Sequence, residues 1–291
     1  MNNAVLIQHA HGEQEHLLDV VGDWHRAYCE HQDMDYWERY GRAQKKYSVY
    51  WDSIFLILEA LRAGYEYVFW LDNDAVITNL AIDLREALPE DKDLGLCRTN
   101  ERWWKEQCEN PHSFLHPHVD DFPIRDGFPV AYNTGAFYIR NSGGTLRFFE
   151  TCWNWIEHDL PQGEQVAVNQ VLHSTFPMER FVELDRQWNT FMPIDNCPDS
   201  VVVAWHGCSF DLKVRQITSV LEHLTAVLSA TYGRRTAAHV IYKRATGRIK
   251  AVLKGPADAL RRIPPGCGGL ASHAGVSARD HLVKNGVVFA K

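Results

Sequence analysis

Short apolar strands alternate with helical patterns from the start of the chain to about residue 211. The segment 67–71, YVFWL, is apolar throughout, which is typical of a strand buried on both faces of a parallel sheet. Further strands are predicted over 4–9, 34–38, 94–98, 133–140, 181–184 and 201–205, and helices over 13–30, 49–63, 145–158 and 164–173, with Gly64 as a helix cap. This order favours an α/β sandwich around a mostly parallel sheet.

The sequence contains three Asp-x-Asp pairs, and their surroundings differ. Asp72 and Asp74 directly follow the apolar segment 67–71, whereas the pair at 33–35 follows a helix end and the pair at 91–93 lies in a polar stretch. Ligands of open α/β sheets bind beyond the carboxyl ends of the strands. Two neighbouring carboxylates there repel each other unless a cation or a proton relieves them. We therefore interpret Asp72 and Asp74 as metal ligands and the other two pairs as a turn and a solvated loop.

Carboxylate oxygens suit Mg²⁺ or Mn²⁺, and these ions usually keep some positions for phosphate oxygens. The expected chemistry is therefore on a diphosphate. His206 follows another apolar segment, 201–205, and the strand-end rule places it near the same rim. An Asp/Asp/His site favours Mn²⁺ weakly over Mg²⁺. The alternative for His206 is an ordinary hydrogen-bonded surface group.

Five segments, in order, resemble glycosyltransferase family 34, which includes plant xyloglucan xylosyltransferases, fungal galactosyltransferases and Golgi mannosyltransferases. They are YVFWLDNDAVI at 67–77, NTGAFYIRNS at 133–142, GEQ at 163–165, LDRQWN at 184–189 and HGC at 206–208. The resemblance covers about residues 4–212. It departs from the family at Gly163, where the family has the first Asp of an Asp-Asp-Gln stretch, and in having no membrane anchor.

The resemblance implies a GT-A fold and transfer of a hexose or pentose, with retention, from a nucleotide-sugar donor to a glycan or lipid-linked acceptor. A UDP-sugar is favoured over a GDP-sugar. The resemblance further implies that Asp72 and Asp74 bind Mn²⁺ (or Mg²⁺) and the ribose and diphosphate of the donor, with His206 as the third metal ligand. It assigns the donor sugar or the reacting carbon to Glu164 and Gln165, and the donor-sugar pocket to Asn133, Thr134 and Gly135.

These roles agree with the charges that such a reaction develops. A divalent cation stabilises the departing diphosphate as a Lewis acid, and preorganised positive charge adds to this effect. Lys213, Arg215 and Lys46 are candidates for that positive charge, with solvated surface positions as the alternative. An oxygen of Glu164 or Gln165 could stabilise an oxocarbenium-like sugar, although both residues could instead cap a helix.

The net charge of −7 is divided unevenly along the chain. Residues 1–211 carry 16 basic and 34 acidic side chains, whereas residues 212–291 carry 14 basic and 3 acidic ones. We expect a catalytic domain over 1–211 and a basic, helical, partly flexible extension over 212–291, with predicted helices at 212–229 and 236–253. The extension could contact an anionic membrane surface near a lipid-linked acceptor, or pack as a cap on the acidic domain. The acidic net charge argues against a nucleic acid partner.

Seven cysteines without a CxxC pair favour reduced thiols, and no apolar run approaches the roughly 18–20 residues of a membrane span. We expect a cytoplasmic protein, or one that also lies peripherally at the inner membrane surface. The aromatic and His-rich segment 103–126 is a candidate acceptor loop. One alternative function is an inactive nucleotide-sugar or carbohydrate-binding protein of the same fold. Another is a nucleotidyltransferase, but its expected Gly-rich basic loop is replaced here by HAHG at 9–12.

Overall fold

The computed structural model describes residues 2–99, 105–106, 109–110, 123–125, 128–155, 163–192, 197 and 199–232. Its central sheet has six strands in the order β2-β1-β3-β8-β5-β9. They are β2 (Asp35–Tyr40), β1 (Ala4–Ala10), β3 (Tyr67–Leu71), β8 (Ala136–Arg140), β5 (Leu94–Cys97) and β9 (Phe181–Leu184). All strands run parallel except β8, which is antiparallel to both of its neighbours. The predicted α/β fold with a mostly parallel sheet is confirmed.

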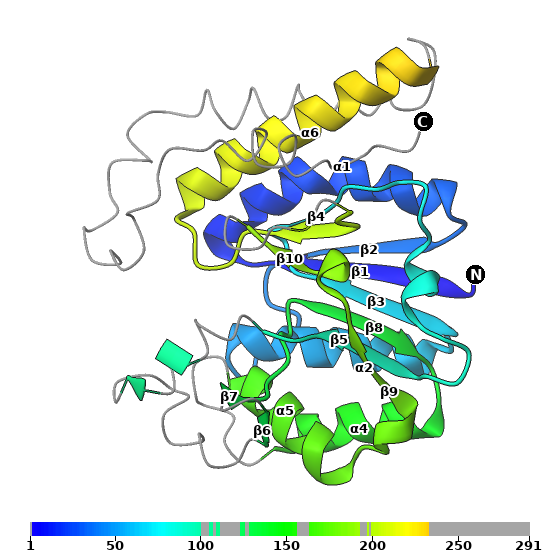
Figure 1. Cartoon of the computed structure of the whole chain (residues 1–291), viewed down its shortest axis with the longest axis vertical. Helices are drawn as coiled ribbons and strands as arrows, with labels where there is room; N and C mark the ends of the chain where they lie inside the picture. The colour runs from blue at the N-terminus through cyan, green and yellow to red at the C-terminus, as the bar shows by residue number, and fades with distance from the viewer. Residues whose placement is uncertain are drawn as a thin grey trace.

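Helices cover both faces of the sheet (Figure 1). On one face lie α2 (Asp52–Ala63), α4 (Gly143–Trp153) and α5 (Gly163–Thr175), and on the other lie α1 (Glu15–His31) and α6 (Phe210–Tyr232). Side chains of β1 alternate between the two sides, since Val5 and Ile7 pack in the α2 core cluster while Leu6 packs with residues of α1. A two-stranded ribbon of β6 (Ile124–Arg125) and β7 (Phe128–Pro129) lies outside the main sheet.

A second, three-stranded sheet lies on the α1 side and consists of β10 (Thr190–Phe191), β11 (Val202–Ala204) and β4 (Ala75–Ile77). β11 runs antiparallel to β4, with Ala204 opposite Ala75. The segment predicted as a strand over 201–205 therefore belongs to this small sheet and not to the central one. This pairing matters for the site, because β4 begins directly after Asp74.

Local capping explains where the structure differs from the predicted helix bounds. The helix predicted from residue 49 begins at Asp52, because Val49–Trp51 forms a 3-10 turn. Its end is as predicted, since Gly64 adopts the left-handed conformation with φ of 90° that glycine tolerates best. α4 begins two residues earlier than predicted, because the Ser142 side chain accepts a hydrogen bond from the Thr145 amide and starts the helix there.

α6 coincides with the first helix predicted for the basic extension. Its apolar residues Val214, Ile217 and Leu221 pack with Leu17 and Val21 of α1 in one buried cluster. The start of the extension therefore covers the catalytic part of the chain. The second predicted helix, 236–253, lies outside the described residues. Among those residues, no helix is both long and apolar enough to cross a membrane.

Candidate functional site

Asp72 leaves the carboxyl end of β3 in a tight turn. Its amide donates to the Gly135 carbonyl at 2.8 Å, and its own carbonyl accepts from the Ala75 amide at 3.0 Å. The Trp70 indole nitrogen donates to Asp72 Oδ1 at 3.0 Å, so one carboxylate oxygen is occupied within the protein. The other oxygen, Oδ2, faces Gly135. The turn therefore presents a single, oriented oxygen of Asp72 at the edge of the sheet.

His206 reaches this turn through the small sheet. Because β11 pairs antiparallel with β4, the chain after Ala204 runs back beside Asp74, and the Trp205 amide donates to the Asp74 carbonyl at 3.3 Å. One ligand atom each from Asp72, Asp74 and His206 lies within 4.8 Å of the other two. The sequence placed His206 near the carboxylates by the strand-end rule of a parallel sheet. The structure brings it there by antiparallel pairing in a different sheet.

The charges in this group are unequal. Burial, followed by the neighbouring charge of Asp74, raises the pKa of Asp72 to about 6. Burial alone would raise the pKa of Asp74 as well, but the neighbouring His206 and the ammonium of Lys213 lower it below its ordinary value. Lys213 Nζ donates to Asp74 Oδ2 at 2.5 Å, so this lysine from α6 already provides a cation at the carboxylates.

A divalent cation fits these three side chains. Asp74 Oδ1 and His206 Nε2 are buried and have no hydrogen-bond partner, although such buried polar atoms are usually satisfied. The missing side chain of Gly135 keeps the space between the ligands open, since a Cβ there would lie 2.7 Å from His206 Cε1 and 2.9 Å from Asp72 Oδ2. Two carboxylates and an imidazole are a donor set that Mn²⁺ accepts.

The segment 133–135 and the start of α5 meet beside these ligands. Asn133 Oδ1 accepts from the Gly135 amide at 2.8 Å and from Asn189 Nδ2 at 2.9 Å. Thr134 Oγ1 donates to Gln165 Oε1 at 3.3 Å. Of the three residues that the resemblance assigned to the donor-sugar pocket, Asn133 and Gly135 are therefore joined by a hydrogen bond, and Thr134 bonds to the start of α5.

Glu164 stands in the same buried environment. Burial, with a smaller contribution from the charge of Asp72, raises the pKa of its carboxyl to about 8, although hydrogen bonds from the backbone of Glu164 and Gln165 and from Thr134 act to lower it. Glu164 Oε2 and Gln165 Nε2 are buried without a hydrogen-bond partner. Both side chains thus carry unused polar atoms close to the acidic turn, which an incoming polar ligand could satisfy.

The three predicted cations are placed differently. Lys213 lies on Asp74, whereas Arg215 is exposed on α6. Lys46 is also exposed, and its ammonium lies 4.5 Å from the centre of the Tyr47 ring. Within the described part of the chain, no hydrogen bond or ion pair joins Lys46 or Arg215 to the carboxylates of the turn.

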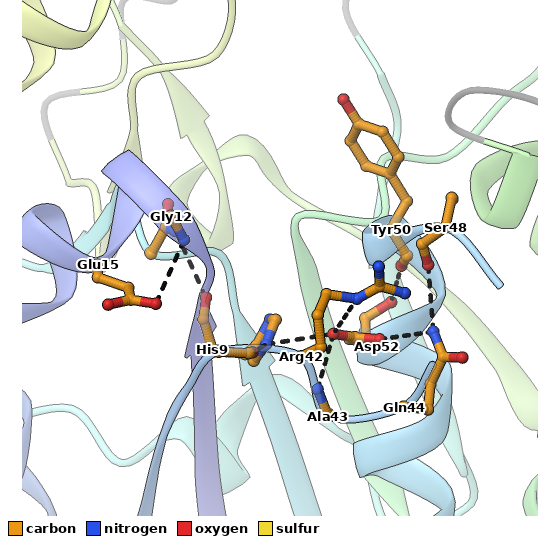
Figure 2. Close-up of polar contacts among 12 residues, drawn as sticks. His9, Gly12, Glu15, Arg42, Ala43, Gln44, Ser48, Tyr50 and Asp52 are labelled. Atoms are coloured by element: carbon orange, nitrogen blue, oxygen red, sulfur yellow. Dashed lines mark hydrogen bonds and ion pairs between the residues drawn. The ribbon is translucent and has the colours of Figure 1, made fainter. Parts of the chain in front are cut away.

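The loop that carries Lys46 is held by Asp52, which is fully buried at the start of α2 (Figure 2). Asp52 accepts hydrogen bonds from the Ala43 amide at 2.9 Å and from Gln44 Nε2 at 2.6 Å. His9 Nε2 lies 3.3 Å and Arg42 Nε 3.6 Å from the same carboxylate. Because His9 lies one residue before the end of β1, these contacts fix the loop at the carboxyl edge of the sheet, the edge on which the acidic turn also lies.

Sequence reasoning did not identify Trp70 or Asn169 as parts of the site. Asn169 is fully buried on α5, accepts from the Tyr132 amide at 2.6 Å and donates to the Tyr132 carbonyl at 2.9 Å, so it anchors the chain just before Asn133. The signal in the sequence that could have identified Asn169 is a polar residue directly after the apolar run 166–168 of the predicted helix. Trp70 lies two positions before Asp72, and this spacing is typical of neighbours on one side of a strand. The predicted acceptor loop 103–126 lies mostly outside the described residues.

Comparisons with known proteins agree with this geometry. A model of the galactosyl transferase GMA12/MNN10 family matches residues 4–183. Among solved structures, a glycosyltransferase involved in the glycosylation of the major capsid of PBCV-1 is 13% identical with a TM-score of 0.50, over 77% of this chain and 98% of that one. Mouse xyloside xylosyltransferase 1 is 11% identical, with a TM-score of 0.42 over 70% and 97% of the two chains. The galactosyltransferase LgtC, with donor and acceptor sugar analogs, is 12% identical, with a TM-score of 0.43 over 84% and 95%.

None of the curated proteins matches the sequence. At such low identity, the structural likeness establishes the fold, which is that of GT-A glycosyltransferases.

Proposed function

The chain belongs to the galactosyl transferase GMA12/MNN10 family and is a glycosyltransferase, and from this premise we propose the details of its reaction. It transfers a hexose or pentose from a nucleotide-diphosphate sugar, a UDP-sugar in preference to a GDP-sugar, to a glycan or lipid-linked acceptor. The transfer depends on Mn²⁺ or Mg²⁺ and retains the anomeric configuration. The observation that carries this proposal is the group of Asp72, Asp74 and His206 around Gly135, in which Asp74 Oδ1 and His206 Nε2 are buried without a hydrogen-bond partner.

In this reaction, Asp72 and Asp74 hold the cation with His206 and orient the diphosphate of the donor. The bound cation supplies Lewis-acid stabilisation of the departing nucleoside diphosphate. Lys213 adds positive charge at the same point, because its ammonium already lies on Asp74. Lys46, on the loop that Asp52 holds at the same edge of the sheet, supplies a second positive charge to the donor.

The donor sugar lies over Asn133, Thr134 and Gly135. Thr134 orients Gln165, and oxygens of Gln165 or Glu164 stabilise positive charge at the anomeric carbon. The raised pKa of Glu164 favours its neutral form until a cation or a substrate changes its surroundings. While Glu164 is neutral, the amide oxygen of Gln165 is therefore better suited to stabilise the positive charge at the anomeric carbon. Glu164 contributes most to this stabilisation when its carboxyl is ionised.

The test is the release of nucleoside diphosphate from a panel of UDP- and GDP-sugars, with and without Mn²⁺. Asp72→Ala and Asp74→Ala should abolish the Mn²⁺-dependent release and leave the fold intact. Asp91→Ala is the matched control, because Asp91 begins another Asp-x-Asp pair but is itself exposed and should change nothing. The second member of that pair, Asp93, is buried on Arg180 and not in a solvated loop as the sequence suggested. Full activity in either site variant would refute the metal assignment. Donor binding without any release across the panel would favour the alternative of an inactive nucleotide-sugar-binding protein.

We further propose that the basic extension brings a cytoplasmic enzyme to an anionic membrane surface that carries its acceptor. Of the 14 basic residues in 212–291, 12 follow Tyr232, and each contributes about 1 kcal/mol near such a surface. α6 must stay in the deletion experiment, because it packs on α1. The full chain and a chain that ends at Tyr232 are therefore compared by flotation with phosphatidylglycerol vesicles. Only the full chain should float, and equal binding of both would remove the membrane proposal.

A further inference from the structure

A fully buried polar side chain on β1 contacts the acidic turn from behind. Gln8 lies among the apolar residues of β1, and its Nε2 donates to the Asp72 carbonyl at 3.1 Å. That carbonyl also accepts the Ala75 amide, which closes the turn. Gln8 is therefore bonded to the backbone of a proposed metal ligand and not to its carboxylate.

His25 on α1 fixes the orientation of the Gln8 amide. The Ile77 amide donates to His25 Nε2 at 3.1 Å, and because a backbone amide can only donate, Nε2 carries no proton. The proton of the neutral ring is then on Nδ1, which donates to Gln8 Oε1 at 2.5 Å. Tyr36 on β2 donates its hydroxyl to the same oxygen at 2.8 Å. With two donors on the Gln8 oxygen, its amide nitrogen must face Asp72.

This network holds both ends of the segment that carries the carboxylates. Gln8 bonds to Asp72 at the start, and His25 bonds to Ile77 at the end, with Asp74 between them. Burial lowers the pKa of His25 to about 3, so the ring stays neutral and its hydrogen bonds do not change with pH across the neutral range. The three side chains that form it, Gln8, His25 and Tyr36, are uncharged, so they add no charge that would compete with a cation.

Resting on the proposed metal-dependent transfer, we propose that Gln8 and His25 are positioning residues, which hold the Asp72–Asp74 turn in the geometry that a divalent cation requires. Metal–ligand distances tolerate changes of only about 0.2 Å. Groups that orient ligands from outside typically contribute 10- to 100-fold to metal affinity. Loss of the Gln8 amide leaves the Asp72 carbonyl with one donor fewer and the His25 Nδ1–H without its acceptor, so the turn can shift.

The experiment measures the binding of Mn²⁺ alone, without donor, by the loss of the free Mn²⁺ signal in electron paramagnetic resonance. Gln8→Met keeps the length of the side chain and removes the amide, and it should weaken Mn²⁺ binding at least tenfold. Tyr36→Phe, a nearly isosteric change, removes one of the two donors to Gln8 and should weaken binding several-fold in a chain that folds normally.

Tyr28→Phe is the matched control. Tyr28 lies on the same helix as His25 and is equally buried, but its hydroxyl bonds to the Ile82 carbonyl and the Leu84 amide, away from the turn. This variant should lose stability and keep the Mn²⁺ affinity of the wild type.

Three results would overturn the inference, and they point to different causes. Wild-type Mn²⁺ affinity in Gln8→Met and Tyr36→Phe would remove the positioning role and leave the proposed function untouched. An equal loss of affinity in Tyr28→Phe would mean that the network only contributes to general stability. A wild-type chain that does not bind Mn²⁺ would overturn the proposed metal site and the inference with it.

Discussion

A methyl group at Gly135 should damage the proposed metal site more than the fold. The Cβ of Gly135→Ala would lie 2.7 Å from His206 Cε1, 2.8 Å from Asn133 Oδ1 and 2.9 Å from Asp72 Oδ2. Because unstrained contacts of carbon need about 3.5 Å, these groups must retreat by roughly 0.6 to 0.8 Å. That shift exceeds the tolerance of about 0.2 Å for metal–ligand distances. We expect Mn²⁺ to bind at least tenfold more weakly, which is about 1.4 kcal/mol.

The same substitution should lower the free energy of unfolding by about 1 to 3 kcal/mol, the usual cost of a crowded core. Gly143→Ala is the control, because its Cβ would meet only Arg147 Nη1 at an ordinary 3.5 Å at the start of α4. Mn²⁺ titration by electron paramagnetic resonance and urea unfolding of both variants separate the two effects. If Gly135→Ala binds Mn²⁺ like the wild type, the space next to Gly135 is not the metal site.

Three further changes test the charges around the site. Lys213→Met removes the ammonium that competes for Asp74, so Mn²⁺ alone should bind more tightly while sugar transfer slows; weaker Mn²⁺ binding would contradict the competition. The folded pKa of Glu164, about 8, lies above the ordinary value of 4.5. The folded cation-free protein therefore keeps a proton that the unfolded chain loses, and its stability falls by up to about 1.4 kcal/mol per pH unit between these values. Glu164→Gln should lose this dependence in urea unfolding, and an unchanged pH profile would refute it. Asp52→Asn leaves Arg42 without its carboxylate and should lower the free energy of unfolding. The loss should be smaller than the roughly 3 to 5 kcal/mol that breaking a fully buried ion pair costs, because Arg42 is partly exposed. Trypsin should then cleave the adjacent lysine-containing loop faster, and unchanged cleavage would argue against Asp52 as its anchor.

Local patterns were enough to predict most of the elements that carry the site. The apolar run over Tyr67–Leu71 predicted β3 with its observed bounds, and Asp72 and Asp74 follow it as the strand-end argument requires. Gly64 was recognisable as a helix cap for the same reason, because its conformational freedom acts within one turn of the chain. Such signals depend on neighbouring residues alone, and a linear sequence contains them in full.

Three other features depend on which segments pair or pack together in the folded chain. His206 joins the carboxylates because β11 pairs antiparallel with β4, an arrangement that the apolar pattern of 201–205 does not distinguish from a central strand. Lys213 meets Asp74 across 139 residues of sequence because α6 packs on α1. Gln8 and His25 lie on different elements, β1 and α1, and only the three-dimensional arrangement joins them to the turn.

The physical reason is the range of each interaction. Hydrophobic periodicity and turn chemistry act over a few residues, so the sequence determined the α/β architecture, the acidic strand end and the identity of the metal ligands as candidates. Hydrogen bonds and ion pairs form only when atoms come within about 3 to 4 Å, which distant segments reach only after the sheets have assembled. The tertiary structure therefore decided which cation lies on Asp74 and which backbone groups hold Asp72. It also decided that the site has no room for a side chain at Gly135.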